Sequence, residues 1–150
     1  EQVMLMLQRI GTKEKAQQFV QDALQAKEKV MGIGHRVYKN GDPRAAVLKK
    51  MSDQLTRKIQ QHHLYEMSTL IDGTMQKEKG LMPNVDFYSA TVYYSMGIPI
   101  DLYTPIFAVS RISGWLAHAA EQYANNRIYR PRGQWAGPEM LPWKPLDQRV

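Results

Sequence analysis

The sequence predicts an all-α fold, and three observations support this prediction. Apolar residues recur at three- and four-residue spacing in several segments, as on the buried face of a helix. The alternation of apolar and polar residues that is typical of strands is almost absent. Glycine, proline, asparagine and aspartate separate the apolar segments at positions that favour helix ends.

Two helices are expected at the start of the chain. The first has a short apolar stripe, formed by Val3, Met6, Leu7 and Ile10. Gly11-Thr12 is expected to end it and to cap the next helix, in which Glu14 lies in the favourable first turn. The apolar face of that second helix comprises Phe19, Val20, Ala23 and Leu24.

A glycine-rich segment, residues 31–35, interrupts the helical pattern, and Asn40-Gly41 predicts a turn. Asp42-Pro43 resembles an N-cap followed by proline at the first helical position. The apolar residues of the helix that follows are Val47, Leu48, Met51, Leu55 and Ile59.

Three further segments complete the predicted order. One helix is expected from Leu64 to about Lys79, and Pro83-Asn84 predicts the start of another that runs to about Met96. Thr104-Pro105 predicts the start of a long helix that reaches about Asn126. The tail contains four prolines after residue 128, so regular helix is excluded there. Its tryptophans predict that it lies across another surface of its own chain or of a partner.

Composition narrows the possible functions. The chain has 150 residues, no cysteine and a formal net charge of +6. Disulfides and cysteine-bound metals are therefore excluded, and a reducing, cytoplasmic location is expected. No apolar run approaches the roughly 18 residues of a membrane helix. The positive charge suits either plain solubility or polyanionic partners.

Because the chain enters a helical pattern directly at Glu1, we expect the natural protein to begin further upstream.

Arg111 is the only formally charged residue between Pro105 and Ala120. A helix this apolar is expected to be buried on most sides. A buried guanidinium needs an anion because it does not lose its proton. Both a structural ion pair and a ligand carboxylate satisfy that need.

Asp86 and His35 are the other candidates for chemistry. Asp86 lies in the first turn of its predicted helix, either as an ordinary helix-start acid or as a general base that nearby aromatic residues shield from water. His35 follows Gly32-Ile33-Gly34, where glycines allow the backbone to approach a ligand closely. A histidine there can donate a hydrogen bond to a carbonyl or act as an acid. His62-His63 is expected to be a solvated helix end, and His118 a core or interface residue.

Taken together, four segments resemble the citrate synthase family in the family's own order. They are residues 32–39 with Asp42-Pro43-Arg44, residues 83–89 (Pro-Asn-Val-Asp-Phe-Tyr-Ser), residues 107–111 (Phe-Ala-Val-Ser-Arg) and residues 130–132 (Arg-Pro-Arg). The resemblance covers essentially all 150 residues, and citrate synthases and 2-methylcitrate synthases share these motifs.

The resemblance implies a citrate-synthase-like multihelical fold in two parts. Residues 1–98 resemble the small domain, which closes over the substrate in the family, and residues 99–150 resemble the long helix and C-terminal arm of the large domain and dimer interface. The implied reaction condenses acetyl-CoA with oxaloacetate to citrate and CoA, and the alternative is 2-methylcitrate synthesis from propionyl-CoA. No metal or redox cofactor is implied. Coenzyme A takes part only as a component of the substrate acetyl-CoA. The implied assembly is a homodimer without nucleic-acid or membrane partners.

The resemblance also implies residue roles. Asp86 corresponds to the base that removes a proton from acetyl-CoA, and His35 to the group that polarises the ketone of oxaloacetate. The arginines that bind the carboxylates of oxaloacetate in the family correspond to Arg44, Arg111 and Arg130. The arginine that corresponds to Arg130 reaches into the site of the other subunit. The CoA contacts correspond to Gly32, Ile33, Gly34 and Lys39, with Lys79 as a weaker candidate.

One departure from the family pattern concerns a second catalytic histidine. The family carries it in a Gly-Pro-Leu-His-Gly-Gly-type segment just upstream of the position that matches Glu1, and these 150 residues contain no such segment. The chain is therefore expected to be a fragment of the enzyme that is inactive alone.

Two readings from other classes remain open. A basic helical nucleic-acid binder would show DNA affinity that falls steeply with salt, but the lysines and arginines are scattered along the chain rather than gathered on one stripe. A non-catalytic interaction fragment would associate through its apolar long helix and arm.

Overall fold

The computed structural model describes residues 1–149, and its regular structure is helical, as predicted. The α-helices are α1 (Gln2–Ile10), α2 (Lys13–Gln25), α3 (Pro43–Lys58), α4 (His63–Lys79), α5 (Val85–Ser95) and α6 (Tyr103–Ala124). Two short 3₁₀ helices are η1 (Ile100–Leu102) and η2 (Leu146–Gln148). The chain divides into two compact units, residues 1–112 and the residues from 113 on.

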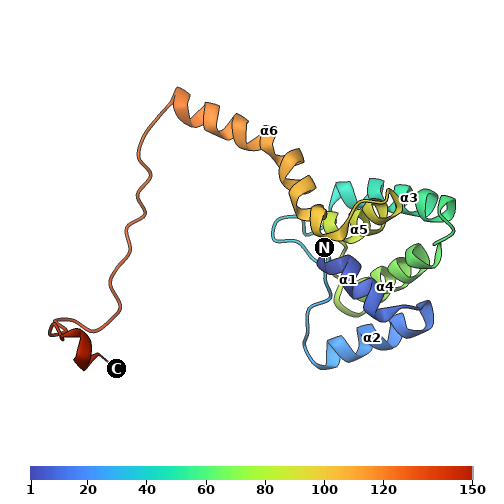
Figure 1. Cartoon of the computed structure of the whole chain (residues 1–150), viewed down its shortest axis with the longest axis horizontal. Coiled ribbons are helices and arrows are strands. Elements are labelled where there is room, and N and C mark those ends of the chain that lie inside the picture. The colour runs from blue at the N-terminus through green and yellow to red at the C-terminus, as the bar shows by residue number, and fades with distance from the viewer. Residues whose placement is uncertain (150) are drawn as a thin grey trace. The chain divides into compact units, whose positions relative to one another are not determined.

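The core of the first unit lies among α1, α2, α4 and α5. Its fully buried side chains include Met4, Leu7, Val20, Met67, Ile71, Phe87 and Tyr88. The helix α2 packs against α4, and α3 packs against α5 (Figure 1). Burial of these apolar side chains, at roughly 25 cal/mol per Å², is the main stabilising contribution to the unit.

Local chemistry sets most helix ends where the sequence predicts them. Gly11 follows α1 with a φ of 76°, and Gly80 ends α4 in the left-handed conformation with a φ of 63°. Asp42 caps α3 by accepting a hydrogen bond from the backbone N–H of Arg44, with Pro43 in the first turn. Thr12 precedes α2, but its side chain makes no capping hydrogen bond to the helix backbone.

The fully buried residues of α3 are not the large apolar ones that its sequence carries. Its buried residues are Ala45, Ser52 and Thr56, whereas Val47 and Met51 are exposed. The hydroxyls of Ser52 and Thr91 lie 2.7 Å apart between α3 and α5. A hydrogen-bonded pair of hydroxyls can be buried at little cost, so this face does not need to be apolar.

The helix α6 begins earlier than predicted and is more exposed. It starts at Tyr103, directly after η1, so Thr104-Pro105 falls inside its first turn, where proline is tolerated because the first N–H groups have no helical partner. Tyr103 is its only buried residue within the described chain, so the prediction of a helix buried on most sides is wrong for this chain.

The region after α6 has no α-helix among the described residues, as its prolines predict. Its apolar side chains are exposed, with Ile128 at 94% and Met140 at 97%. None of the described helices is long and apolar enough to cross a membrane.

Candidate active site

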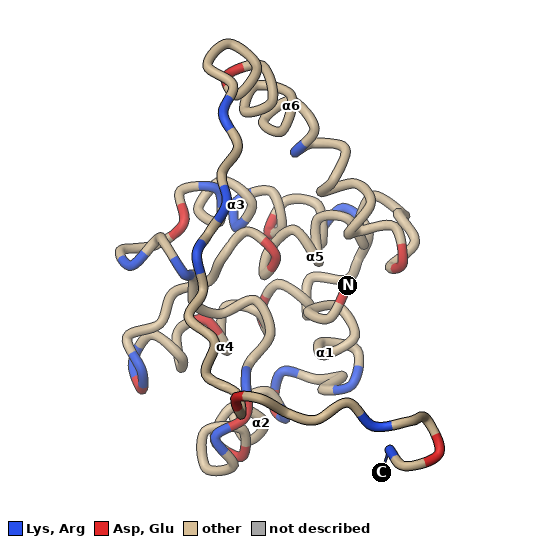
Figure 2. Tube along the Cα trace, turned by 90° about the vertical axis from the view of Figure 1, so that its left-hand side faces the viewer, with Lys and Arg blue, Asp and Glu red and all other residues tan. Residues whose placement is uncertain are grey.

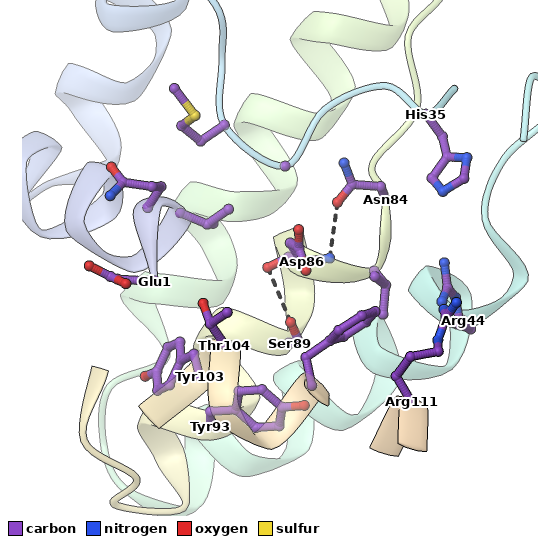
Figure 3. Close-up of a pocket in the computed structure, with 16 residues that line it drawn as sticks. Glu1, His35, Arg44, Asn84, Asp86, Ser89, Tyr93, Tyr103, Thr104 and Arg111 are labelled. Atoms are coloured by element: carbon purple, nitrogen blue, oxygen red, sulfur yellow. Dashed lines mark hydrogen bonds between the residues drawn. The ribbon is translucent and has the colours of Figure 1, made fainter. Parts of the chain in front are cut away.

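A cavity of about 540 Å³ within the first unit is lined by four of the predicted side chains: His35, Arg44, Asp86 and Arg111. Figure 3 draws His35, Arg44 and Arg111 on one side of this pocket and Glu1 and Tyr103 on the other, with Asp86 between them. These residues are far apart in the sequence, so the fold is what brings them to one cavity.

Asp86 is the second residue of α5. The backbone N–H of Asp86 donates to Oδ1 of Asn84, 2.9 Å away, which caps the helix. The exposed carboxylate of Asp86 thus lies in the first turn, where the partial positive charge of the helix N-terminus favours an anion. A carboxylate held there is available to accept a proton.

The loop that carries His35 is fixed to the start of α5 by backbone pairing. Gly34 N donates to Met82 O at 2.7 Å, and Asn84 N donates to Gly32 O at 2.9 Å. The side-chain amide of Asn84 also donates to Gly34 O at 2.8 Å. Asn84 therefore holds the His35 loop and the Asp86 helix together, a role that its local position as an N-cap does not reveal.

Gly32 is required by this close approach. Its φ is +79°, and a Cβ atom there would lie 2.8 Å from a side-chain carbon of Val3 and 2.9 Å from a ring carbon of Phe87. Only glycine combines that backbone conformation with that space. The predicted close approach at this loop is thus to the protein itself, at the edge of the cavity.

The hydrogen bonds of the His35 ring determine which nitrogen carries its proton. Its Nδ1 accepts from the backbone N–H groups of Val37 and Tyr38, each at 3.0 Å. A neutral imidazole whose Nδ1 accepts carries its proton on Nε2. His35 can therefore donate a hydrogen bond from Nε2 without being charged.

Arg44 is held by Asp42. Its Nε and Nη2 atoms donate to the two carboxylate oxygens of Asp42 at 2.9 and 2.8 Å. The hydrogen bond to Asp42 raises the pKa of Arg44, and the same bond holds the pKa of Asp42 below its usual value. Arg44 is thus a permanent cation at the cavity wall.

Arg111 has no carboxylate partner within ion-pair distance among residues 1–149. Its guanidinium carbon lies 5.5 Å from the centre of the Phe107 ring. Of the two possibilities that the sequence leaves open for Arg111, the structural ion pair is thus not formed within the described chain. Two guanidinium groups at one cavity, from Arg44 and Arg111, favour an anionic ligand.

The other predicted site residues lie elsewhere. Of the three predicted CoA contacts Gly32, Ile33 and Gly34, Gly32 lines the cavity, whereas Ile33 and Gly34 pair with residues 82–84. Lys39 is exposed, and its Nζ donates to the carbonyl of His35 at 3.3 Å. Arg130 belongs to the second unit, where it is exposed.

Charge is not gathered on a single stripe of the first unit. Figure 2 shows Lys and Arg interspersed with Asp and Glu over α2 and α3, whereas α6 is mostly uncharged. This distribution lacks the continuous basic track that usually accompanies nucleic-acid binding.

A family model described as the citrate synthase C-terminal domain matches residues 1–132. The chain belongs to the citrate synthase family. It is 55% identical over 150 residues to "Citrate synthase 2" of Bacillus subtilis, covering all of this chain and 40% of that protein. It is 51% identical over 139 residues to "Citrate/2-methylcitrate synthase" of the same organism, covering 92% of this chain and 37% of that protein.

The fold is likewise that of citrate synthases. A solved citrate synthase from Thermoplasma acidophilum, in a ternary complex with carboxymethyl coenzyme A and oxaloacetate, matches with a TM-score of 0.88 and 34% identity. That match covers 98% of this chain and 41% of the solved one. The chain thus spans about 40% of the length of the citrate synthases that it matches.

Proposed function

We propose that this chain is the C-terminal part of an enzyme that condenses acetyl-CoA with oxaloacetate to give citrate and CoA. The observation that carries the proposal is the single cavity lined by His35, Arg44, Asp86 and Arg111. It joins a carboxylate, a neutral imidazole donor and two guanidinium groups. Those are the groups that a condensation of an acyl thioester with a 2-oxo dicarboxylate needs.

In this proposal Asp86 removes a proton from the methyl carbon of acetyl-CoA. The resulting enol carbon forms a bond to the ketone carbon of oxaloacetate, and the electron pair of the ketone moves onto its oxygen. The Nε2–H of His35 donates to that oxygen as negative charge develops. Water then hydrolyses the thioester and releases citrate and CoA.

Substrate binding is assigned to the basic groups. Arg44 and Arg111 bind the carboxylates of oxaloacetate, because a guanidinium makes paired hydrogen bonds to a carboxylate. Arg130 completes that set from the partner subunit of a homodimer. The CoA moiety is assigned to Gly32, Ile33, Gly34 and Lys39, with Lys79 as a weaker candidate.

The domain roles follow the same proposal. Residues 1–98 form the small domain that closes over the substrates, and residues 99–150 belong to the large domain and the dimer interface. Closure excludes water and so protects the intermediate thioester from early hydrolysis. Because the chain spans about 40% of the length of its relatives, we expect the rest of the enzyme to supply the enol-stabilising histidine and to be needed for full activity. In this proposal the enzyme works in the cytoplasm.

The test uses the full-length protein that carries this chain. Free CoA is measured after mixing acetyl-CoA and oxaloacetate, with the wild type, Asp86→Asn and the matched exposed acid Asp22→Asn on α2. We expect Asp86→Asn to lower kcat by at least about a hundredfold, because general base catalysis contributes about that much. Oxaloacetate binding is expected to persist in Asp86→Asn, and Asp22→Asn is expected to behave as the wild type.

Either of two results would contradict the proposal: a wild type that releases no CoA, or an Asp86→Asn variant that turns over normally. Propionyl-CoA is assayed in parallel, because one relative carries the name citrate/2-methylcitrate synthase. A higher kcat/KM with propionyl-CoA would assign 2-methylcitrate synthesis instead.

A further inference from the structure

Asp42 is the most completely bonded buried carboxylate beside the cavity. Its side chain is 0% exposed. Oδ1 accepts from the backbone N–H of Arg44 at 3.0 Å and from its Nε at 2.9 Å. Oδ2 accepts from Nη2 of Arg44 at 2.8 Å and from the backbone N–H of Val85 at 3.0 Å. One carboxylate thus joins the start of α3 to the start of α5.

Helix capping accounts for only one of these four bonds. An N-cap residue needs a single acceptor for an N–H of the first turn, and serine or threonine supplies it as well as aspartate does. The two bonds to the guanidinium and the bond to Val85, 43 positions further along the chain, are additional. Burial of the negative charge is compensated because a cation and two helix N-termini face it.

The geometry of the pair leaves part of the arginine free. Asp42 binds the edge of the guanidinium formed by Nε and Nη2. A guanidinium has a second edge, formed by Nη1 and Nη2, which can bind another carboxylate. Arg44 lines the 540 Å³ cavity, whereas Asp42 lines a neighbouring cavity of about 440 Å³ and not the first. Asp42 therefore lies behind Arg44 and does not contact a ligand in the first cavity directly.

We infer that Asp42 is a positioning residue for oxaloacetate: it holds the plane of the Arg44 guanidinium so that the free edge meets a substrate carboxylate. Its bond to Val85 ties that arginine to the residue before Asp86. Asp42 thus fixes the position of the carboxylate-binding arginine relative to the base, Asp86. This inference rests on the proposed function, because it assigns Arg44 to the dicarboxylate.

The decisive variant is Asp42→Ser in the full-length protein. Serine keeps the cap of α3 but removes the bonds to the guanidinium. We expect the KM for oxaloacetate to rise at least about tenfold, because charge-assisted hydrogen bonds that orient the arginine are lost. The KM for acetyl-CoA is expected to change less than about twofold, since no CoA contact is assigned to Arg44.

A double-mutant cycle with Arg44→Lys separates positioning from a general structural effect. If Asp42 acts through the guanidinium, Asp42→Ser has no further effect on the KM for oxaloacetate once Arg44 is lysine. Direct titration with oxaloacetate gives the same comparison for binding alone. Circular dichroism and thermal unfolding establish that each variant is folded. The matched control is Asp22→Ser, an exposed aspartate on α2 outside the residues that line the cavity.

The outcomes distinguish the two proposals. Loss of oxaloacetate affinity in Asp42→Ser, absent in the Arg44→Lys background, supports the inference. An active wild type with an unchanged KM for oxaloacetate in Asp42→Ser overturns the inference alone. Equal weakening in both backgrounds also overturns it, because Asp42 would then act independently of Arg44. A wild type that releases no CoA overturns the proposed function as well.

Discussion

At the scale of single residues, Gly32 is the position at the edge of the cavity that is least able to accept a side chain. Its left-handed φ and the proximity of Val3 and Phe87 both oppose a side chain. We expect Gly32→Ala to lower the free energy of unfolding by about 2 kcal/mol or more, because strain and overpacking add. Urea denaturation measures the change.

Gly73 provides the matched control for that substitution. It lies in the interior of α4, and a Cβ there would meet nothing within 4 Å. Gly73→Ala is expected to raise stability by up to about 1 kcal/mol, because alanine has the higher helix propensity. Equal effects of the two substitutions would show that the constraint at Gly32 has been misjudged.

The Asp42–Arg44 pair predicts a pH dependence of stability. The hydrogen bond from Arg44 holds the pKa of Asp42 below its usual value in the folded chain, so the unfolded chain binds more protons in that range. Stability from this pair is complete above the unfolded pKa of about 4 and is lost as the pH falls through the lower folded pKa.

The corresponding experiment compares urea unfolding of the wild type and Asp42→Asn between about pH 2 and pH 6. Asparagine has no proton to gain in this range. The difference in stability between the two proteins is expected to shrink as the pH falls. A constant difference across the range would mean that ionisation of Asp42 contributes nothing.

At the scale of helices, the contact between α3 and α5 depends on a polar pair. Thr91 donates to the carbonyl of Tyr88 at 3.0 Å, so Ser52 is the donor in the 2.7 Å bond between the two hydroxyls. Both side chains are fully buried. The two helices that carry Arg44 and Asp86 are therefore held in register by a directional bond as well as by apolar contact.

Removing one partner is expected to cost more than removing both. Ser52→Ala leaves the Thr91 hydroxyl without its donor and should lower the free energy of unfolding by about 1–3 kcal/mol. The double variant Ser52→Ala with Thr91→Val replaces both hydroxyls and should recover part of that loss. Urea denaturation of the wild type, the two single variants Ser52→Ala and Thr91→Val, and the double variant gives the coupling energy. Strictly additive losses would argue against the pair.

At the scale of the whole chain, α6 exposes several large apolar side chains. Val109, Ile112 and Leu116 recur at helical spacing and are 73%, 48% and 63% exposed. An exposed apolar surface of this kind favours association. The 150-residue chain by itself is expected to self-associate with rising concentration in sedimentation velocity.

Two variants locate that association. Ile112→Ser with Leu116→Ser is expected to shift the chain toward monomer, because apolar area at the contact is removed. Val47→Ser is the matched control, since Val47 is 60% exposed on α3. If the chain is monomeric at every concentration, the hypothesis that it is a non-catalytic fragment that associates through α6 is rejected.

The sequence by itself determined the all-α class, the order of the helices and most of their ends. Gly11, Asp42-Pro43, Gly80 and Asn84 act on N–H and carbonyl groups within a few residues of themselves, so their effects are visible in a linear pattern. The resemblance to citrate synthases also named His35, Arg44, Asp86 and Arg111, which the fold brings to one cavity.

Only the tertiary structure decided what those patterns left open. The buried face of α3 carries hydroxyls because Thr91 faces Ser52, 39 positions away. Asn84 reaches Gly34 across 50 positions, and Asp42 reaches Val85 across 43. Such bonds depend on which surfaces pack together, and packing is a property of the whole chain that no local spacing encodes.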